Sequence, residues 1–134
     1  MSYVLDTNVL AALMRGEERV IQRLERVTRP MVAVPEPAWA EVAYGLARIP
    51  RSKRRERLVS RFALLREQLP TVTWSAAVTE AFGALKASLE EKGQRLEDFD
   101  LAIAAHALAT DAILVTANVR HLGRIPDLSM EDWG

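Results

Sequence analysis

The side chains best suited to chemistry in this sequence are three carboxylates that lie far apart along it: Asp6, Glu41 and Asp100. Asp6 follows the β-favouring residues 3–5 and precedes an apolar, helix-compatible stretch, so it should lie where a strand leads into a helix. Parallel α/β sheets bind ligands at that edge, and a carboxylate there could hold a metal ion. Alternatively, Asp6 or Asn8 only caps the helix, and this stretch by itself favours neither interpretation.

Glu41 lies in a predicted helix that follows Pro35. The apolar stripe of this helix has the spacing i, i+3, i+4, i+7 and consists of Trp39, Val42, Ala43 and Leu46. Glu41 lies nearly opposite Trp39, between the small residues Ala38 and Gly45, and a glycine inside a helix suggests close approach of another element. The alternative is that Glu41 faces solvent, as most glutamates do.

Asp100 stands at the beginning of a predicted helix that is apolar nearly all round from Phe99 onward and should therefore be packed inside the domain. Acidic residues at a helix N-terminus are also favoured by capping and by the helix dipole, which need no site. Since two acids exceed what one cap requires, we expect Asp98 to cap the helix and Asp100 to point into a cleft.

A second strand-to-loop edge carries small polar side chains at Thr116 and Asn118, after the strongest strand pattern in the chain, residues 112–116. Asn118 could belong to a site or could equally cap the short helix 119–122. His106 has no second His or Cys on its helix, so we expect it to be packed or partly exposed rather than a ligand.

The elements that must position these residues alternate along the chain. Strand patterns at residues 3–5, 31–34, 71–73, 112–116 and 127–129 are separated by helical patterns. The helix with the apolar stripe at residues 39–46 and the next one, with its stripe at 58–69 after a break at 50–52, should form a hairpin. Such alternation predicts a single domain, residues 1–134, with an α/β/α three-layer sandwich around a central parallel sheet of about four or five strands. Right-handed connections place all strand C-termini at one edge, where Asp6, Glu41 and Asp100 could converge.

Three converging carboxylates repel one another unless a cation is present. The sequence contains no Cys and two His, which makes a zinc site improbable. A site made of oxygen ligands alone suits Mg²⁺, with Mn²⁺ as a possible substitute.

Four segments, in order, carry a family resemblance: LDTN (5–8), EVAYG (41–45), FDLAIAAHA (99–107) and LVTANVR (114–120), with a similar closing segment at 130–133. With these motifs the whole chain resembles the PIN-domain ribonucleases, and more closely the VapC-type toxins of toxin–antitoxin pairs. The resemblance implies a PIN-like fold and a Mg²⁺-dependent endoribonuclease that hydrolyses RNA. It also implies a small cognate antitoxin and a homodimer as partners.

The same resemblance implies roles for the site residues. Asp6 and Asp100 would be the principal metal ligands, Glu41 would hold metal directly or through water, and Thr116 and Asn118 would shape the site. Many PIN domains carry a fourth acid where this chain has Asn118, which leaves open whether a second metal binds.

The distribution of charged and apolar residues indicates which partners and which location to expect. The net charge is zero, but basic residues gather between positions 48 and 66, on a face that could contact RNA or the antitoxin or could simply be solvated: Arg48, Arg51, Lys53, Arg54, Arg55, Arg57, Arg61 and Arg66. Neither a secretory signal nor an apolar run of about 18 residues is present, so we expect a soluble, cytoplasmic protein without a membrane segment.

Two rival classes share this architecture. A phospho-acceptor receiver domain needs paired acids after the first strand and a Lys after the last, and neither is evident. A catalytically silent RNA- or protein-binding module is the remaining alternative, and the presence of all three acids favours the enzyme.

Overall fold

The structure of the protein is a computed structural model that describes residues 2–134. Its strands are all parallel and form one sheet in the order β3-β2-β1-β4-β5. The strands are β1 (Tyr3–Leu5), β2 (Val32–Pro35), β3 (Thr71–Val72), β4 (Ile113–Val115) and β5 (Met130–Glu131). The predicted parallel sheet of an α/β/α fold is thereby confirmed.

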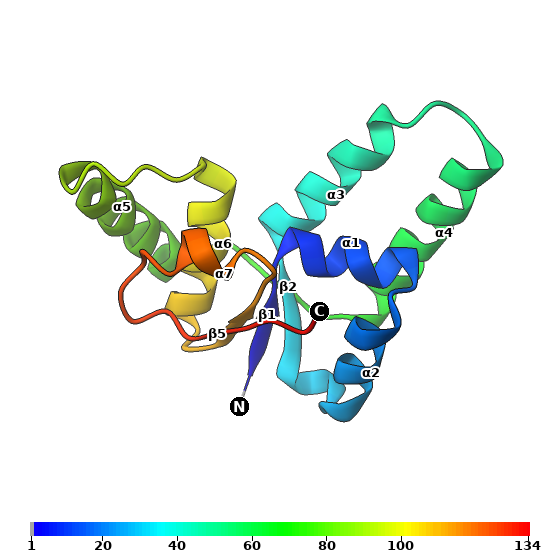
Figure 1. Cartoon of the computed structure of the whole chain (residues 1–134), viewed down its shortest axis with the longest axis horizontal. Coiled ribbons are helices and arrows are strands. Elements are labelled where there is room, and N and C mark those ends of the chain that lie inside the picture. The colour runs from blue at the N-terminus through cyan, green and yellow to red at the C-terminus, as the bar shows by residue number, and fades with distance from the viewer. Residues whose placement is uncertain (1) are drawn as a thin grey trace.

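Helices cover both sides of this sheet. They are α1 (Thr7–Arg15), α2 (Glu18–Arg26), α3 (Glu36–Arg48), α4 (Lys53–Gln68), α5 (Ala76–Glu91), α6 (Asp98–Ala109) and α7 (Val119–Leu122), with a 3₁₀ turn at Arg29–Met31. Figure 1 shows α1 to α4 on one side of the sheet and α5, α6 and α7 on the other. No helix within residues 2–134 is long and apolar enough to span a membrane.

The central strand β1 decides where the site lies. It pairs with β4 so that Leu5 is opposite Val115, and the residues that follow, Asp6 and Thr116, leave the sheet side by side. Leu5 and Leu114 are fully buried, as expected for strands covered by helices on both faces. Helix α6 is buried from Leu101 to Ala107, which confirms the prediction of an internal helix.

Two sequence predictions about these elements are wrong. The last strand is Met130–Glu131 rather than 127–129, because Asp127 has φ 65°, the left-handed conformation of a turn and not of a strand. Ala43 is exposed although we placed it on the core stripe of α3. The buried face of α3 instead includes Ala38 together with Trp39, Val42 and Leu46.

Helices α3 and α4 form the predicted hairpin, which extends away from the sheet in Figure 1. Trp39 of α3 meets Phe62 of α4 edge to face, with ring centroids 5.6 Å apart. The guanidinium of Arg55 donates to the carbonyl of Leu46 (3.3 Å). Helix α4 has no fully buried residue, so apolar contacts along one half-buried face and these polar contacts hold it in place.

Candidate acidic site at the carboxyl edge of the sheet

Asp6 is held in a fixed orientation where β1 leads into α1. Its carboxylate accepts hydrogen bonds from the Thr7 backbone N–H (2.7 Å at Oδ1), from Thr116 Oγ1 (2.6 Å at Oδ2) and from Asn8 Nδ2 (3.2 Å at Oδ2). The side chain is 3% exposed. Asp6 is the N-cap residue of α1, so the prediction that it caps the helix is confirmed. A cap does not require the two additional side-chain donors, which fix the second oxygen.

The donors to Asp6 connect β1 with the loop after β4. Thr116 is fully buried, donates to Asp6 and accepts from the Asn118 backbone N–H (2.9 Å). Asn8 donates to Asp6 and accepts from the Ala117 backbone N–H (3.1 Å). Two segments about 110 positions apart in sequence therefore share one hydrogen-bond network, and Thr116 and Asn8 set the position of the Asp6 carboxylate.

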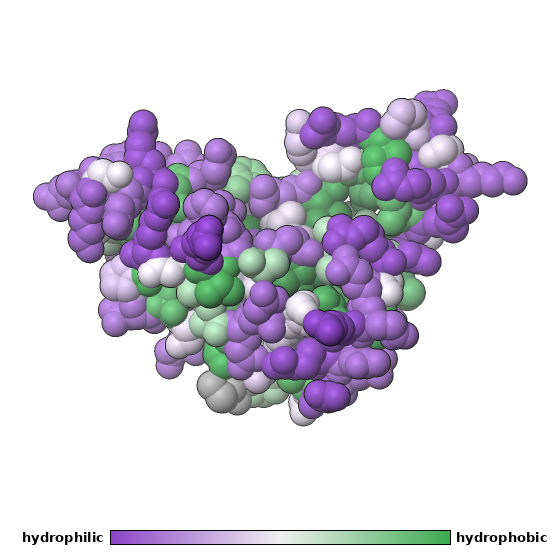
Figure 2. Space-filling view, viewed as in Figure 1, coloured by the Kyte–Doolittle hydropathy of each residue, from purple (hydrophilic) through white to green (hydrophobic). Residues whose placement is uncertain are grey.

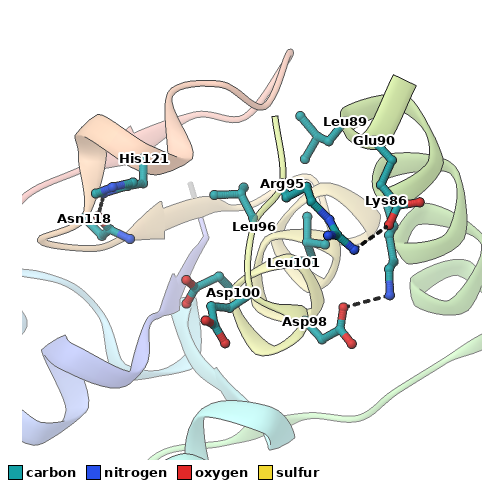
Figure 3. A pocket seen from close by; sticks show the side chains of 11 residues that line it. Lys86, Leu89, Glu90, Arg95, Leu96, Asp98, Asp100, Leu101, Asn118 and His121 are labelled. Atoms are coloured by element: carbon teal, nitrogen blue, oxygen red, sulfur yellow. Dashed lines mark hydrogen bonds and ion pairs between the residues drawn. The ribbon is translucent and has the colours of Figure 1, made fainter. Parts of the chain in front are cut away.

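Asn118 does not cap α7 with its side chain, although it occupies the N-cap position. Its Oδ1 accepts from Nδ1 of His121 (2.8 Å), and Figure 3 shows this pair beside the Asp100 side of α6. Sequence reasoning missed His121 as a site residue. The signal was its spacing of three from Asn118 on a predicted helix, which places the two side chains on one face.

Glu41 is half-buried rather than free in solvent. Thr7 Oγ1 donates to Glu41 Oε1 (2.5 Å), so the first residue of α1 directs a carboxylate of α3 toward the β1 edge. Gly45 does not explain this placement, because a Cβ at Gly45 would meet no atom within 4 Å. The expected close approach at Gly45 is wrong, and Glu41 is positioned by packing of α3 against α1.

Asp100 lies in the first turn of α6 and is half-buried. The pKa of Asp100 is raised from 3.8 to about 6, first by burial and then by the charges of Asp6, Glu41 and Glu97. The charge of His121 acts in the opposite direction and lowers it. No hydrogen bond contributes to this shift. The charges of Asp6 and Glu41 therefore act on Asp100, whose burial already disfavours its ionised form.

Asp98 does not cap α6, contrary to expectation. The N-cap residue is Glu97, without a side-chain bond, and Asp98 is the first helical residue. Asp98 pairs instead with Lys86 of α5 (3.0 Å), and Figure 3 shows Asp98 and Asp100 on different sides of α6. The prediction that Asp100 points away from the capping position toward a cleft agrees with this arrangement.

Two cavities lie on either side of the first turn of α6. One, of about 650 Å³, is lined by Asp100, Asn118 and His121 and by the cations Lys86 and Arg95 (Figure 3). The other, of about 580 Å³, lies between α3 and α6 and is lined by Glu41 and Asp100 among others. The half-buried carboxylates of Glu41 and Asp100 are therefore accessible to a ligand, whereas the side chain of Asp6 is buried.

The chemistry of these donors fits a hard cation. All three predicted ligands offer carboxylate oxygens, and their mutual repulsion is what a cation would relieve. Within residues 2–134, no group of three or more His, Cys, Asp or Glu side chains is arranged so that it could hold a metal ion. Mg²⁺ normally takes one or two protein carboxylates and completes its shell with water and phosphate oxygens, so an open site of this kind suits it.

His106 is packed in the core, as expected. It is fully buried, its Nδ1 donates to the Ala102 carbonyl (2.7 Å), and Trp74 meets its ring edge to face at 5.4 Å. Burial lowers the pKa of His106 below 6.5. This histidine is therefore a neutral structural residue apart from the acidic site.

Fold and site together define an α/β protein with an acidic site at the carboxyl edge of a parallel sheet, and comparison with known families makes the class more specific. The model of the PIN domain family matches residues 3–128, and the chain belongs to that family. The relatives are VapC proteins, which confirms the resemblance inferred from the motifs.

Relatives of the chain match it over nearly its whole length. Ribonuclease VapC2 of Rickettsia felis is 34% identical over 135 residues, which cover 99% of this chain and 98% of the relative. The tRNA(fMet)-specific endonuclease VapC of Salmonella typhimurium is 27% identical over 133 residues, with 99% and 98% covered. The solved structure of VapBC2 from Rickettsia felis bound to a DNA fragment from their promoter matches with a TM-score of 0.87 and 32% identity over 100% of both chains.

Proposed function

We propose that this protein is a metal-dependent endoribonuclease that hydrolyses RNA phosphodiester bonds and acts as the toxin of a toxin–antitoxin pair. The observation that supports the proposal is that Asp6, Glu41 and Asp100, from three separate elements, lie close enough for the charges of Asp6 and Glu41 to raise the pKa of Asp100. Its relatives named ribonuclease or endonuclease VapC support the same reaction class.

The metal would be Mg²⁺, or Mn²⁺ with the same oxygen ligands. Asp6 and Asp100 would hold it, and Glu41 would contact it directly or through water. When bound, the ion supplies an activated water and neutralises charge on the phosphate oxygens.

The residues of the chain supply orientation and proton transfer. Thr116 and Asn8 hold the Asp6 carboxylate, and Thr7 holds Glu41, so that neither acid must reorganise when substrate arrives. Glu41 or Asp100 accepts the proton of the attacking water if it lies within about 3 Å of it. Asn118 and His121 form the wall of the site on the α7 side.

The proposed partners are RNA, a small antitoxin and a second copy of the chain. Solved relatives are VapBC complexes, which supports a partner protein. Arginines of α4 provide a basic face for RNA or for the antitoxin. Arg55, Arg61 and Arg66 donate to Leu46, Met14 and Glu36 within the chain. The exposed cations of α4 that remain for a partner are Lys53, Arg54 and Arg57.

The test is cleavage of labelled RNA in Mg²⁺ and in chelator, with wild type, Asp100→Asn and Asp132→Asn. Asp132 is an exposed acid outside the site, so it controls for loss of one negative charge. We expect cleavage in Mg²⁺ by wild type and Asp132→Asn, and loss of cleavage in chelator and in Asp100→Asn. Binding of RNA without cleavage by wild type would instead establish the alternative, a silent binding module on the same fold.

A further inference from the structure

The first turn of α6 separates two cavities that differ in the groups they offer. On the α3 side, Glu41 and Asp100 line one cavity. On the α7 side, Asp100, Asn118 and His121 line the other (Figure 3). Figure 2 shows the surface hollowed between the part formed by α3 and α4 and the part formed by α5 and α6. Asp100 therefore lies between a carboxylate of α3 and an imidazole of α7.

The ring of His121 is oriented through one of its two nitrogens. Nδ1 donates to Oδ1 of Asn118 (2.8 Å), and the side chain of His121 is exposed. A carboxamide oxygen only accepts hydrogen bonds, so Nδ1 keeps its proton whether the imidazole is neutral or charged. The proton that the ring gains and loses is therefore the one on Nε2. Because the ring is exposed, solvent can replace that proton.

The cavity on the α7 side holds other charged groups around His121. They come from α5, from the following loop and from the first turn of α6: Lys86, Glu90, Arg95, Glu97, Asp98 and Asp100. Lys86 pairs with Asp98 (3.0 Å). Arg95 lies 3.8 Å from Glu90. Ammonium and guanidinium groups are poor proton donors near neutral pH, whereas imidazole gains and loses its proton there, so His121 is the cation of this cavity that suits proton transfer.

Hydrolysis of a phosphodiester needs one group on each side of the phosphorus. The attacking water and the leaving oxygen lie in line, on opposite sides of it. Under the proposed function, Asp100 helps to hold the ion that binds the scissile phosphate, and Glu41 and His121 line the cavities on the two sides of Asp100. The charge of His121 also lowers the pKa of Asp100, so the imidazole is close enough to act at this position.

We propose that His121 is the general acid of the reaction and that Asn118 positions it. The inference rests on the proposed nuclease function and adds a catalytic residue to the same site. The water oxygen bonds to phosphorus while Glu41 takes one of the water protons. The bond between phosphorus and the leaving oxygen breaks, and that oxygen takes the proton from Nε2 of His121, which becomes neutral. Solvent then removes the proton from Glu41 and returns one to His121.

The experiment uses a substrate that does not need an acid. A labelled RNA that wild type cuts at one mapped bond is compared with the same RNA in which sulphur replaces the leaving oxygen of that bond. A thiolate leaves without a proton, because a thiol is far more acidic than an alcohol. Wild type is compared with His121→Gln and with Arg124→Gln, which removes an exposed cation that does not line the cavity.

At saturating Mg²⁺, we expect His121→Gln to cut the oxygen RNA about a hundredfold more slowly than wild type in single turnovers. The variant should cut the sulphur RNA at the wild-type rate, and Arg124→Gln should match wild type on both RNAs. The wild-type rate on the oxygen RNA should fall at alkaline pH, where imidazole is neutral, and His121→Gln should lack this fall. RNA affinity in Ca²⁺ and Mg²⁺ affinity by calorimetry should be the same in all three proteins, which separates proton transfer from binding.

Equal slowing of His121→Gln on both RNAs would overturn the proposal, because a structural role does not depend on the leaving atom. Equal rates of His121→Gln and wild type on the oxygen RNA would also overturn it. Failure of the proposed function gives a different result. Wild type that binds RNA without Mg²⁺-dependent cleavage would refute the nuclease, whereas either result above, with cleavage by wild type, would refute the general acid alone.

Discussion

Removal of the Asp100 charge should stabilise the metal-free protein. The pKa of Asp100 in the fold is about 6, compared with 3.8 ordinarily, because burial and the charges of Asp6 and Glu41 disfavour the ionised form. A pKa difference of about two corresponds to about 3 kcal/mol for a fully buried group. Since the side chain is half-buried, solvent screening reduces the expected effect to about 1–2 kcal/mol.

The sign of this effect depends on pH. Between the ordinary pKa of 3.8 and the folded value of about 6, the folded state binds the proton more tightly than the unfolded state does. The Asp100 carboxyl group therefore makes the free energy of unfolding fall as pH rises through that interval. Above the interval, the free energy of unfolding has fallen by the full amount. Asp100→Asn should be more stable than wild type at pH 8, and most of the difference should disappear at pH 4.

The assay is urea unfolding in chelator at both pH values, with Asp132→Asn as the matched variant at an exposed position. Addition of Mg²⁺ should then stabilise wild type more than Asp100→Asn, because the ion neutralises the repulsion that the variant has already lost. A less stable Asp100→Asn at pH 8, or an equal gain at both pH values, would refute the electrostatic argument. Equal stabilisation of both proteins by Mg²⁺ would refute Asp100 as a metal ligand.

Other outcomes follow from named contacts. Thr116→Val removes the buried hydroxyl that donates to Asp6 and accepts from the Asn118 backbone N–H. The free energy of unfolding, measured in urea, should fall by about 1–3 kcal/mol. Mg²⁺ binding, measured by calorimetry, should become weaker. Burial lowers the pKa of His106, so wild type should begin to lose stability as pH falls below 6.5, the ordinary value, while a His106→Gln variant lacks that component in the same titration. Charge reversal of Arg54 should weaken RNA or antitoxin binding and reduce its salt dependence, and unchanged binding to both would mean that the face is merely solvated.

Local sequence was sufficient for most of the elements and for part of the site. The apolar patterns predicted the parallel sheet, the internal helix α6 and the position of Asp6 at a strand end, because strand and helix periods are set by the backbone. The loop after β4 was predicted correctly as the second polar edge, and Thr116 there bonds to Asp6. The motif order also predicted the family that the comparisons confirm.

Sequence alone did not decide which side chains meet. The sequence left open whether Asp6 only caps a helix and whether Glu41 faces solvent. In the fold, Thr116 donates a hydrogen bond to Asp6 and Thr7 donates one to Glu41, and these contacts form only when the chain has folded. The pairing of Asn118 with His121 and the separation of Asp98 from Asp100 likewise depend on helix orientation. Short-range patterns fix the backbone, whereas hydrogen-bond partners and pKa values depend on distances between remote segments, and these exist only in the tertiary structure.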